Sequence, residues 1–116
     1  MKRSKKQRLK KGLDRLIQNI AKQTYDECLV CSNKIFCGHH YIQKKQSLYL
    51  RWDMRNIVPL CNHCHALHHI SGDPRIHQII IRRKGHKWAD ELEKDRRIIL
   101  KDTIINLLDI KERLNG

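Results

Sequence analysis

The sequence predicts a small α+β domain whose centre is pinned by cysteines and whose two ends are helical. The chain has 116 residues and a mass of 13.9 kDa, which suits one domain. Only six residues are aromatic, so the apolar core must be thin and built from Leu and Ile. A domain this small buries a modest share of its surface and often needs an additional staple. Two Cys-x-x-Cys pairs are placed to provide it.

The N-terminal part, residues 1–24, is predicted to be a basic arm that continues into a helix. Seven of the first eleven residues are Lys or Arg. No apolar stretch follows them to make a signal peptide, and no apolar run approaches the roughly 18 residues of a membrane span. We therefore expect a cytoplasmic protein, in the host cytoplasm if a phage encodes it. Apolar residues then recur at helical spacing, at Leu9, Leu13, Leu16, Ile17 and Ile20.

The central part, residues 25–72, contains the two cysteine pairs, Cys28 with Cys31 and Cys61 with Cys64. In a chain that is not secreted, such cysteines favour a metal site over disulfides. Each pair presents two thiolates about one turn apart, and two pairs complete the tetrahedral shell of a structural Zn²⁺. We interpret the fifth cysteine, Cys37, as a small buried residue.

The histidines gather at the edges of the segment between the cysteine pairs. This segment has 29 residues, more than a plain zinc ribbon needs. His65 and His69 are four residues apart, so on a helix they share one face and can hold one metal ion together. His39 and His40 lie in a strand-like run and point to opposite sides. If His39 turns toward that ion, His40 is left beside the metal as a base.

The C-terminal part, residues 73–116, is predicted to be helical. Asp73 and Pro74 are a good helix start and Gly85 is a good stop. A second helical stretch is expected from about residue 88 to 114, interrupted or bent near residues 100–103. Its expected apolar stripe consists of Trp88, Leu92, Ile99, Ile104, Leu107 and Leu108.

The charge is strongly positive and unevenly distributed. The formal net charge is +13, with 25 basic and 12 acidic residues. Residues 1–85 contain 18 basic and 5 acidic residues, whereas residues 86–116 contain 7 of each. Such a concentration of positive charge indicates a polyanionic partner, most simply nucleic acid. A cationic tail that aids solubility or binds anionic lipid is the alternative.

The residues His39, His40, Asn56 and His65, framed by two Cys-x-x-Cys pairs, resemble the HNH endonucleases. The segment 50–57, leading to Cys61, is similar to the NinG/Rap group of phage recombination nucleases. The resemblance covers about residues 18–97. It implies a zinc-stapled ββα-metal finger with flanking helices, in which residues 1–116 form a single nuclease domain.

The resemblance also implies a role for each residue. His40 is the general base, and Asn56 holds the loop between the strands so that the base stays in register. His39, His65 and His69 are ligands of a catalytic divalent cation, with His68 as an alternative to His69. The chain has more histidines after the second cysteine pair than the NinG/Rap pattern, which leaves the third ligand open.

Phosphodiester hydrolysis explains why these residue types belong together. A divalent ion neutralises the phosphorane and stabilises the leaving oxygen, while a neutral histidine activates the water. Mg²⁺ prefers oxygen ligands, so three imidazoles also suit Mn²⁺, Ni²⁺ or Zn²⁺. The alternative interpretation is that these histidines bind no metal ion themselves and only support, or lie on the surface near, a structural zinc.

Four cations near the loop are candidate DNA contacts. Arg51 and Arg55 have guanidinium groups that can grip a phosphate through two hydrogen bonds, or can pair with Asp53 or solvent instead. Lys44 and Lys45 suit sequence-independent backbone contacts.

The expected function is a metal-dependent endonuclease that hydrolyses DNA, duplex or branched, in phage recombination or processing. The alternatives are a branch-selective nuclease, a non-catalytic zinc DNA-binding module and an RNA-directed nuclease. Cutting branched DNA twice would suit a homodimer, for which the C-terminal apolar stripe is either the interface or an intramolecular core.

Overall fold

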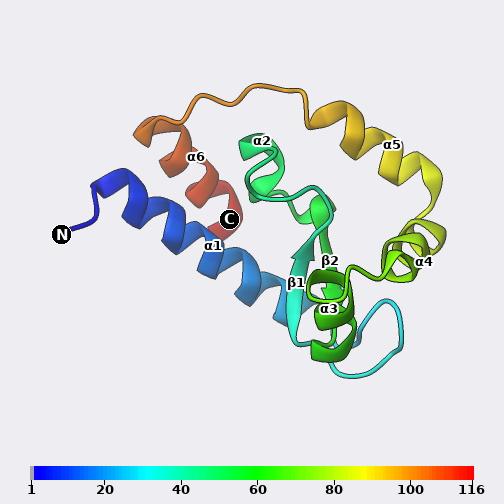
Figure 1. Ribbon diagram of the computed structural model, residues 1–116. Helices are drawn as coiled ribbons and strands as arrows, with labels where there is room; N and C mark the ends of the chain where they lie inside the picture. The colour runs from blue at the N-terminus through cyan, green and yellow to red at the C-terminus, as the bar shows by residue number, and fades with distance from the viewer. Residues whose placement is uncertain (1) are drawn as a thin grey trace.

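The computed structural model describes residues 2–116 and has a two-stranded antiparallel sheet set among six α-helices (Figure 1). The prediction of a small α+β fold is confirmed. The elements in chain order are α1 (Lys5–Thr24), β1 (Cys37–His40), α2 (Leu48–Arg51), the 3₁₀ turn η1 (Met54–Asn56), β2 (Ile57–Leu60), α3 (Asn62–His69), α4 (Pro74–Lys84), α5 (His86–Asp95) and α6 (Ile104–Asn115).

Helix α1 begins earlier than the sequence predicted. The Ser4 hydroxyl accepts a hydrogen bond from the amide of Gln7, whose side chain accepts one from the amide of Ser4. This reciprocal capping box starts the helix at Lys5. Most of the predicted basic arm is therefore helical, and Met1 lies outside the described residues. The predicted apolar face is present, and Leu13, Ile17 and Ala21 are its buried members.

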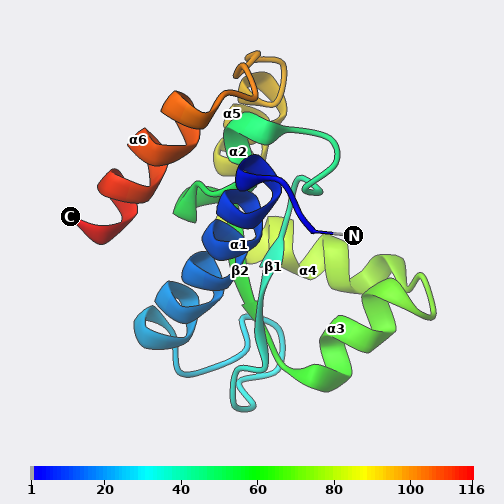
Figure 2. The same ribbon diagram turned by 90° about the vertical axis from the view of Figure 1, so that its left-hand side faces the viewer.

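Helix α1 packs against both α6 and the sheet. Its buried residues join those of α6 and Ile57 in one apolar cluster. Gly38 in β1 permits the close approach, because a Cβ there would lie 2.6 Å from Cγ2 of Ile57 and 2.9 Å from Cβ of Ala21. The two views place α1 and α6 on one side of the strands and α3 and α4 on the other (Figure 1 and Figure 2).

The two strands pair antiparallel, with His39 opposite Val58 and His40 opposite Ile57. All four residues of β2 are buried. The segment 41–56 that joins the strands contains α2 and η1. A second apolar cluster connects β2 to α4 through the buried residues Val58, Leu60, Ile76 and Ile80, and it also contains three of the cysteines. The sheet therefore lies between the α1 side and the cysteine side of the molecule.

The helix predicted between Asp73 and Gly85 is confirmed as α4. The Asp73 carboxylate accepts a hydrogen bond from the amide of Arg75, and Pro74 occupies the first turn. Gly85 ends the helix with a φ of 96°, a conformation that glycine adopts without steric cost. Helix α5 follows at once.

The apolar stripe predicted for residues 88–114 is wrong in part. Ile99 is 90% exposed and Leu108 is 43% exposed, whereas Leu107 and Ile110 are buried. Ile99 lies in the non-helical segment 96–103, which contains the interruption predicted near residues 100–103. Thr103 then caps a new helix by accepting a hydrogen bond from the amide of Asn106. Helix α6 packs against α1 through Leu107 and Ile110, which leaves Leu108 at the edge of the buried face.

Candidate metal centres

Four cysteines form a compact cluster at the end of the sheet away from the segment 41–56. One sulfur atom from each of Cys28, Cys31, Cys61 and Cys64 lies within 4.8 Å of all the others. The Sγ atoms of Cys31 and Cys61 are 3.4 Å apart. A tetrahedral zinc with bonds of about 2.3 Å separates its sulfurs by about 3.8 Å. The spacing therefore fits a structural metal ion, as the sequence predicted.

The local backbone explains how the cysteine loops present their sulfurs. Cys61 is the N-cap of α3, and its Sγ accepts a hydrogen bond of 3.4 Å from the amide of Cys64. The Sγ atom of Cys28 accepts a similar bond of 3.4 Å from the amide of Val30. Backbone N–H groups thus point at the sulfurs, which favours their thiolate form.

The thiols strongly influence one another's protonation. Burial opposes ionisation of Cys61, but hydrogen bonds from the Cys64 amide and the neighbouring thiols lower its pKa to about 7. Burial and the thiol of Cys61 raise the pKa of Cys64 far above its ordinary range. A bound divalent cation would favour the thiolate at all four positions. The four cysteines have no positive charge of their own to balance the thiolates, and a bound cation would supply it.

Three histidines form a second cluster between β1 and α3. One ring nitrogen from each of His39, His65 and His69 lies within 4.8 Å of the other two. The ring centroids of His65 and His69 are 4.4 Å apart, and that of His39 is 5.7 Å and 5.2 Å from them. His65 and His69 project from one face of α3 because they are one helical turn apart. These are the three residues singled out in the sequence.

The protonation state of His39 suits a metal ligand. Burial, together with repulsion from His68, His69, His65 and His40, lowers the pKa of His39 to about 3. The pKa of His65 is also lowered, first by burial and then by its neighbouring histidines. Both rings are therefore neutral at pH 7, and only a neutral imidazole has a lone pair for a metal ion.

His68 takes a different position from its neighbour. Its ring centroid is 4.9 Å from that of His39, but its ring is nearly parallel to that of His77 at 6.5 Å. The His77 ring in turn stacks on Tyr41 at 5.3 Å. The group whose ring nitrogens converge contains His69, the ligand favoured over His68 from the sequence.

His40 lies outside the group of three clustered rings and has a hydrogen bond of its own. Its Nε2 lies 2.7 Å from the carbonyl oxygen of Arg51. A carbonyl only accepts, so Nε2 carries the hydrogen and Nδ1 keeps a lone pair. Burial lowers the pKa of His40, against the opposing effect of this hydrogen bond. The ring is therefore neutral at pH 7 with Nδ1 available as a base.

A single pocket of about 620 Å³ joins the base candidate to the histidine cluster. His39 and His40 both line it, as do His65 and His69 of α3. Lys44 and Lys45 also line it, from the segment that follows β1. The pocket therefore combines convergent imidazole nitrogens with positive charge, a combination that suits an anionic ligand.

Asn56 is fully buried and ties the segment 41–56 together. Its Oδ1 accepts a hydrogen bond of 2.7 Å from the amide of Ile42, and its Nδ2 donates to the carbonyls of Ile42 (2.9 Å) and Leu50 (3.3 Å). The side chain does not line the pocket. Its geometry is that of a positioning residue, which matches the loop-holding role that the resemblance implied.

Two of the four predicted DNA contacts are engaged within the protein. The guanidinium of Arg51 donates two hydrogen bonds, of 3.0 Å and 2.7 Å, to the carboxylate of Asp14. Arg55 pairs with Asp53 and with Asp95. The pair of Arg55 with Asp53 is the alternative that the sequence left open, whereas the partner of Arg51 is Asp14 and not Asp53. Lys44 and Lys45 are exposed at the pocket and keep that prediction open.

Two residues of α1 that help to build the site were missed from the sequence. Asp14 fixes Arg51, whose carbonyl holds His40. Gln18 bonds to Gly38 through both of its amide atoms, each at 2.8 Å. Both are polar residues beside the apolar stripe of a predicted helix, which is the only signal that could have drawn attention to them.

The chain has no match among protein-family models, curated proteins or solved structures. The resemblance to HNH endonucleases therefore stays a prediction. The structure itself shows a four-cysteine cluster that could hold a metal ion and a pocket beside a three-histidine cluster. Among the helices of residues 2–116, none is long and apolar enough to cross a membrane.

Proposed function

We propose that this protein is a metal-dependent endonuclease of the HNH type that hydrolyses phosphodiester bonds in DNA. The observation that carries the proposal is the convergence of His39, His65 and His69 in the same pocket as a differently bonded His40. A purely structural zinc domain has no need for this second group of ligands. The positive charge of residues 1–85 supports an anionic polymer as substrate.

The ligand cluster fits a divalent cation on the chemistry of its donors. Three imidazole nitrogens leave further coordination positions for substrate and water, unlike a shell of four sulfurs. Imidazole ligands suit Mn²⁺, Ni²⁺ and Zn²⁺, with Mg²⁺ a weaker match. Such a cation supplies Lewis-acid neutralisation of the scissile phosphate.

The residues of the chain provide the remaining parts of the reaction. Nδ1 of His40 accepts the proton of the attacking water while Nε2 stays bonded to the Arg51 carbonyl. Asn56 holds the segment after β1 in place through Ile42 and Leu50. Lys44 and Lys45 attract and orient the phosphate backbone at the edge of the pocket.

Substitution of His40 by Ala tests the proposal. The variant should keep its zinc content, melting temperature and DNA affinity, because His40 belongs to neither ligand cluster. Cleavage should fall by about 10² to 10⁴, the contribution of a positioned general base. The assay uses duplex, single-stranded and four-way-junction DNA, each with and without Mg²⁺ or Mn²⁺. Preference for the junction would identify a branch-selective nuclease.

The matched control is His86→Ala, which removes an exposed histidine at the start of α5, outside both clusters. It should cut like the parent. If the parent binds DNA but cuts none of the three substrates with either metal, the chain is a non-catalytic zinc DNA-binding module. If His40→Ala cuts at the parental rate while His39→Ala is inactive, the roles assigned to the two histidines are reversed.

A further inference from the structure

Four cations share one face of α1. Arg8, Lys11, Arg15 and Lys22 are separated by three, four and seven residues, so they follow each other along the same side of the helix. All four are exposed. Within residues 2–116, none of them forms an ion pair with a carboxylate. Arg8 donates one hydrogen bond, to the carbonyl of Arg3. We refer to these four residues as the α1 stripe.

The α1 stripe leads to the histidine pocket. Gln18 lies between Arg15 and Lys22 on the same face, and it lines the pocket together with His39 and His40. Its two hydrogen bonds to Gly38 fix α1 against β1 at this point. Lys22 follows Gln18 by one helical turn on the same face, so the stripe continues past the pocket.

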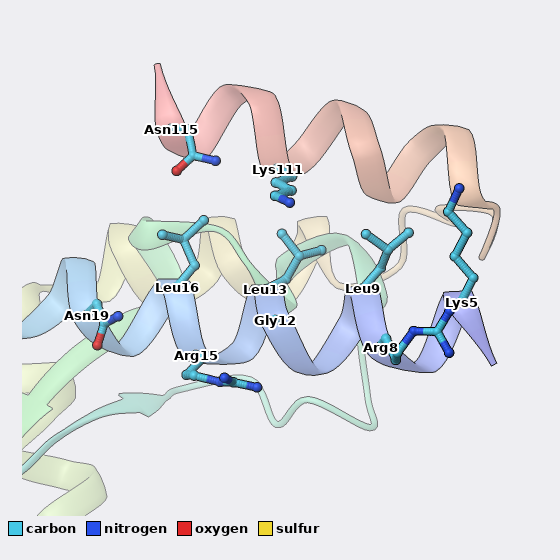
Figure 3. A pocket seen from close by; sticks show the side chains of 10 residues that line it. All are labelled: Lys5, Arg8, Leu9, Gly12, Leu13, Arg15, Leu16, Asn19, Lys111 and Asn115. Atoms are coloured by element: carbon cyan, nitrogen blue, oxygen red, sulfur yellow. The ribbon is translucent and has the colours of Figure 1, made fainter. Parts of the chain in front are cut away.

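Apart from the contact that Gln18 makes with Gly38, the α1 stripe is exposed and lies away from the apolar face of the helix. Figure 3 shows Leu9, Leu13 and Leu16 pointing from α1 toward α6, whereas Arg8 and Arg15 project from another side of the helix. The stripe therefore contributes nothing to the apolar cluster between the two helices. Four unpaired positive charges on one exposed helix face raise the local positive potential, which attracts an anionic partner.

The dimensions of the stripe match a nucleic-acid backbone. Arg8 and Lys22 are fourteen residues apart, which is about 21 Å along a helix. This length corresponds to about six steps of 3.4 Å along a DNA strand. We propose that the α1 stripe binds the sugar-phosphate backbone of the duplex over about six base pairs on one side of the bond that is cut. The inference rests on the proposed function, because it takes the histidine pocket as the place of cutting.

The double substitution Arg8→Gln/Arg15→Gln tests the inference through the salt dependence of DNA binding. Loss of two phosphate contacts should make the slope of log K against log salt less negative by about 2. The parent should then lose about tenfold more affinity than the variant between 50 and 200 mM salt. The matched control is Lys87→Gln/Lys94→Gln, which removes two exposed cations with the same seven-residue spacing on α5. Its slope should equal that of the parent.

Photocrosslinking locates the contact. Benzoylphenylalanine in place of Arg15 should crosslink to a 30-base-pair duplex within about six base pairs of the cut, and in place of Lys94 it should not. Equal slopes for the α1 variant, the control and the parent would overturn the inference. Crosslinks scattered over the duplex would also overturn it. So would an α1 variant that no longer binds vesicles of phosphatidylserine, an anionic lipid, but binds DNA like the parent. If the slope of the stripe variant is less negative but the parent never cuts DNA, the assignment of the stripe as a DNA-binding surface is kept and the nuclease proposal fails.

Discussion

The cysteine and histidine clusters share α3 but differ in their number of ligands and in their access to solvent. Cys61 and Cys64 come from the start of the helix, and His65 and His69 from the turns that follow. Three of the four cysteines are buried, whereas His69 is exposed and His65 is half-buried beside a pocket. Four sulfurs complete a tetrahedral shell, while three nitrogens leave a position for another ligand.

This difference indicates that the cysteine cluster stabilises the fold, whereas the histidine cluster can accept a further ligand. The cysteine cluster joins two loops that are distant in the sequence, and its residues pack with β2 and α4. The histidine cluster depends on α3 being in place but adds no further connection between loops. We therefore expect damage to the cysteine cluster to abolish both centres, and damage to the histidine cluster to spare the fold.

The largest expected effect is that of Cys61→Ser. Structural zinc contributes about 10–16 kcal/mol in small zinc domains, which is comparable to the whole stability of a domain. The variant should lose zinc and its cooperative melting transition, as measured by elemental analysis and circular dichroism. Cys37→Ser is the control, because Cys37 lies outside the cluster. A Cys61→Ser protein that melts like the parent would remove the basis of the comparison.

The next effect is that of His65→Ala on the second metal ion. Removing one of the three ligand nitrogens should lower the affinity for that ion. The loss should exceed the roughly 10- to 100-fold loss that follows when a residue supporting a ligand is removed. Zinc on the cysteines and the melting temperature should be retained. Titration calorimetry with Mn²⁺ measures the loss, with His63→Ala as control, because His63 is an exposed residue of the same helix outside both clusters. Unchanged Mn²⁺ affinity in His65→Ala would exclude this residue as a ligand.

The parts of both clusters could be predicted from the sequence because the spacing within each part is local. Cys-x-x-Cys and the four-residue interval from His65 to His69 fix geometry within one turn. The α4 start at Asp73 and Pro74 was predictable for the same reason. His39 is far from His65 in the sequence. It could be predicted as a member of the cluster only by interpreting residues 39 and 40 as part of a strand.

The parts that could not be predicted depend on contacts between distant segments. Asp14 and Arg51 are 37 residues apart, and nothing in the spacing of either indicates the other. Ile99 is exposed because it lies in the non-helical segment 96–103, and Leu108 because α6 packs on α1 through Leu107 and Ile110. The role of Gln18 could not be predicted because it depends on the packing of α1 against Gly38.

The smallest expected effect is that of Asp14→Asn, a substitution on α1 that tests how this helix supports the histidine pocket. The Asp14 carboxylate accepts two hydrogen bonds from Arg51 and one of 2.9 Å from Nε1 of Trp52. Burial opposes the charge of Asp14, but the Arg51 guanidinium and Trp52 outweigh it and lower its pKa. Asp14→Asn should therefore cost about 1–2 kcal/mol of unfolding free energy at neutral pH.

The pH dependence of this cost identifies its cause. A carboxylate with a lowered pKa in the folded state stabilises the protein above its unfolded pKa, and this contribution is lost as the pH falls through the folded value. The stability gap between the parent and Asp14→Asn, measured by urea denaturation, should therefore be full at pH 6 and close progressively below about pH 4. Because Arg51 also holds His40, cleavage should fall in the variant while zinc on the cysteines is unchanged. A gap independent of pH would mean that packing, and not the charge of Asp14, connects α1 to the histidine pocket.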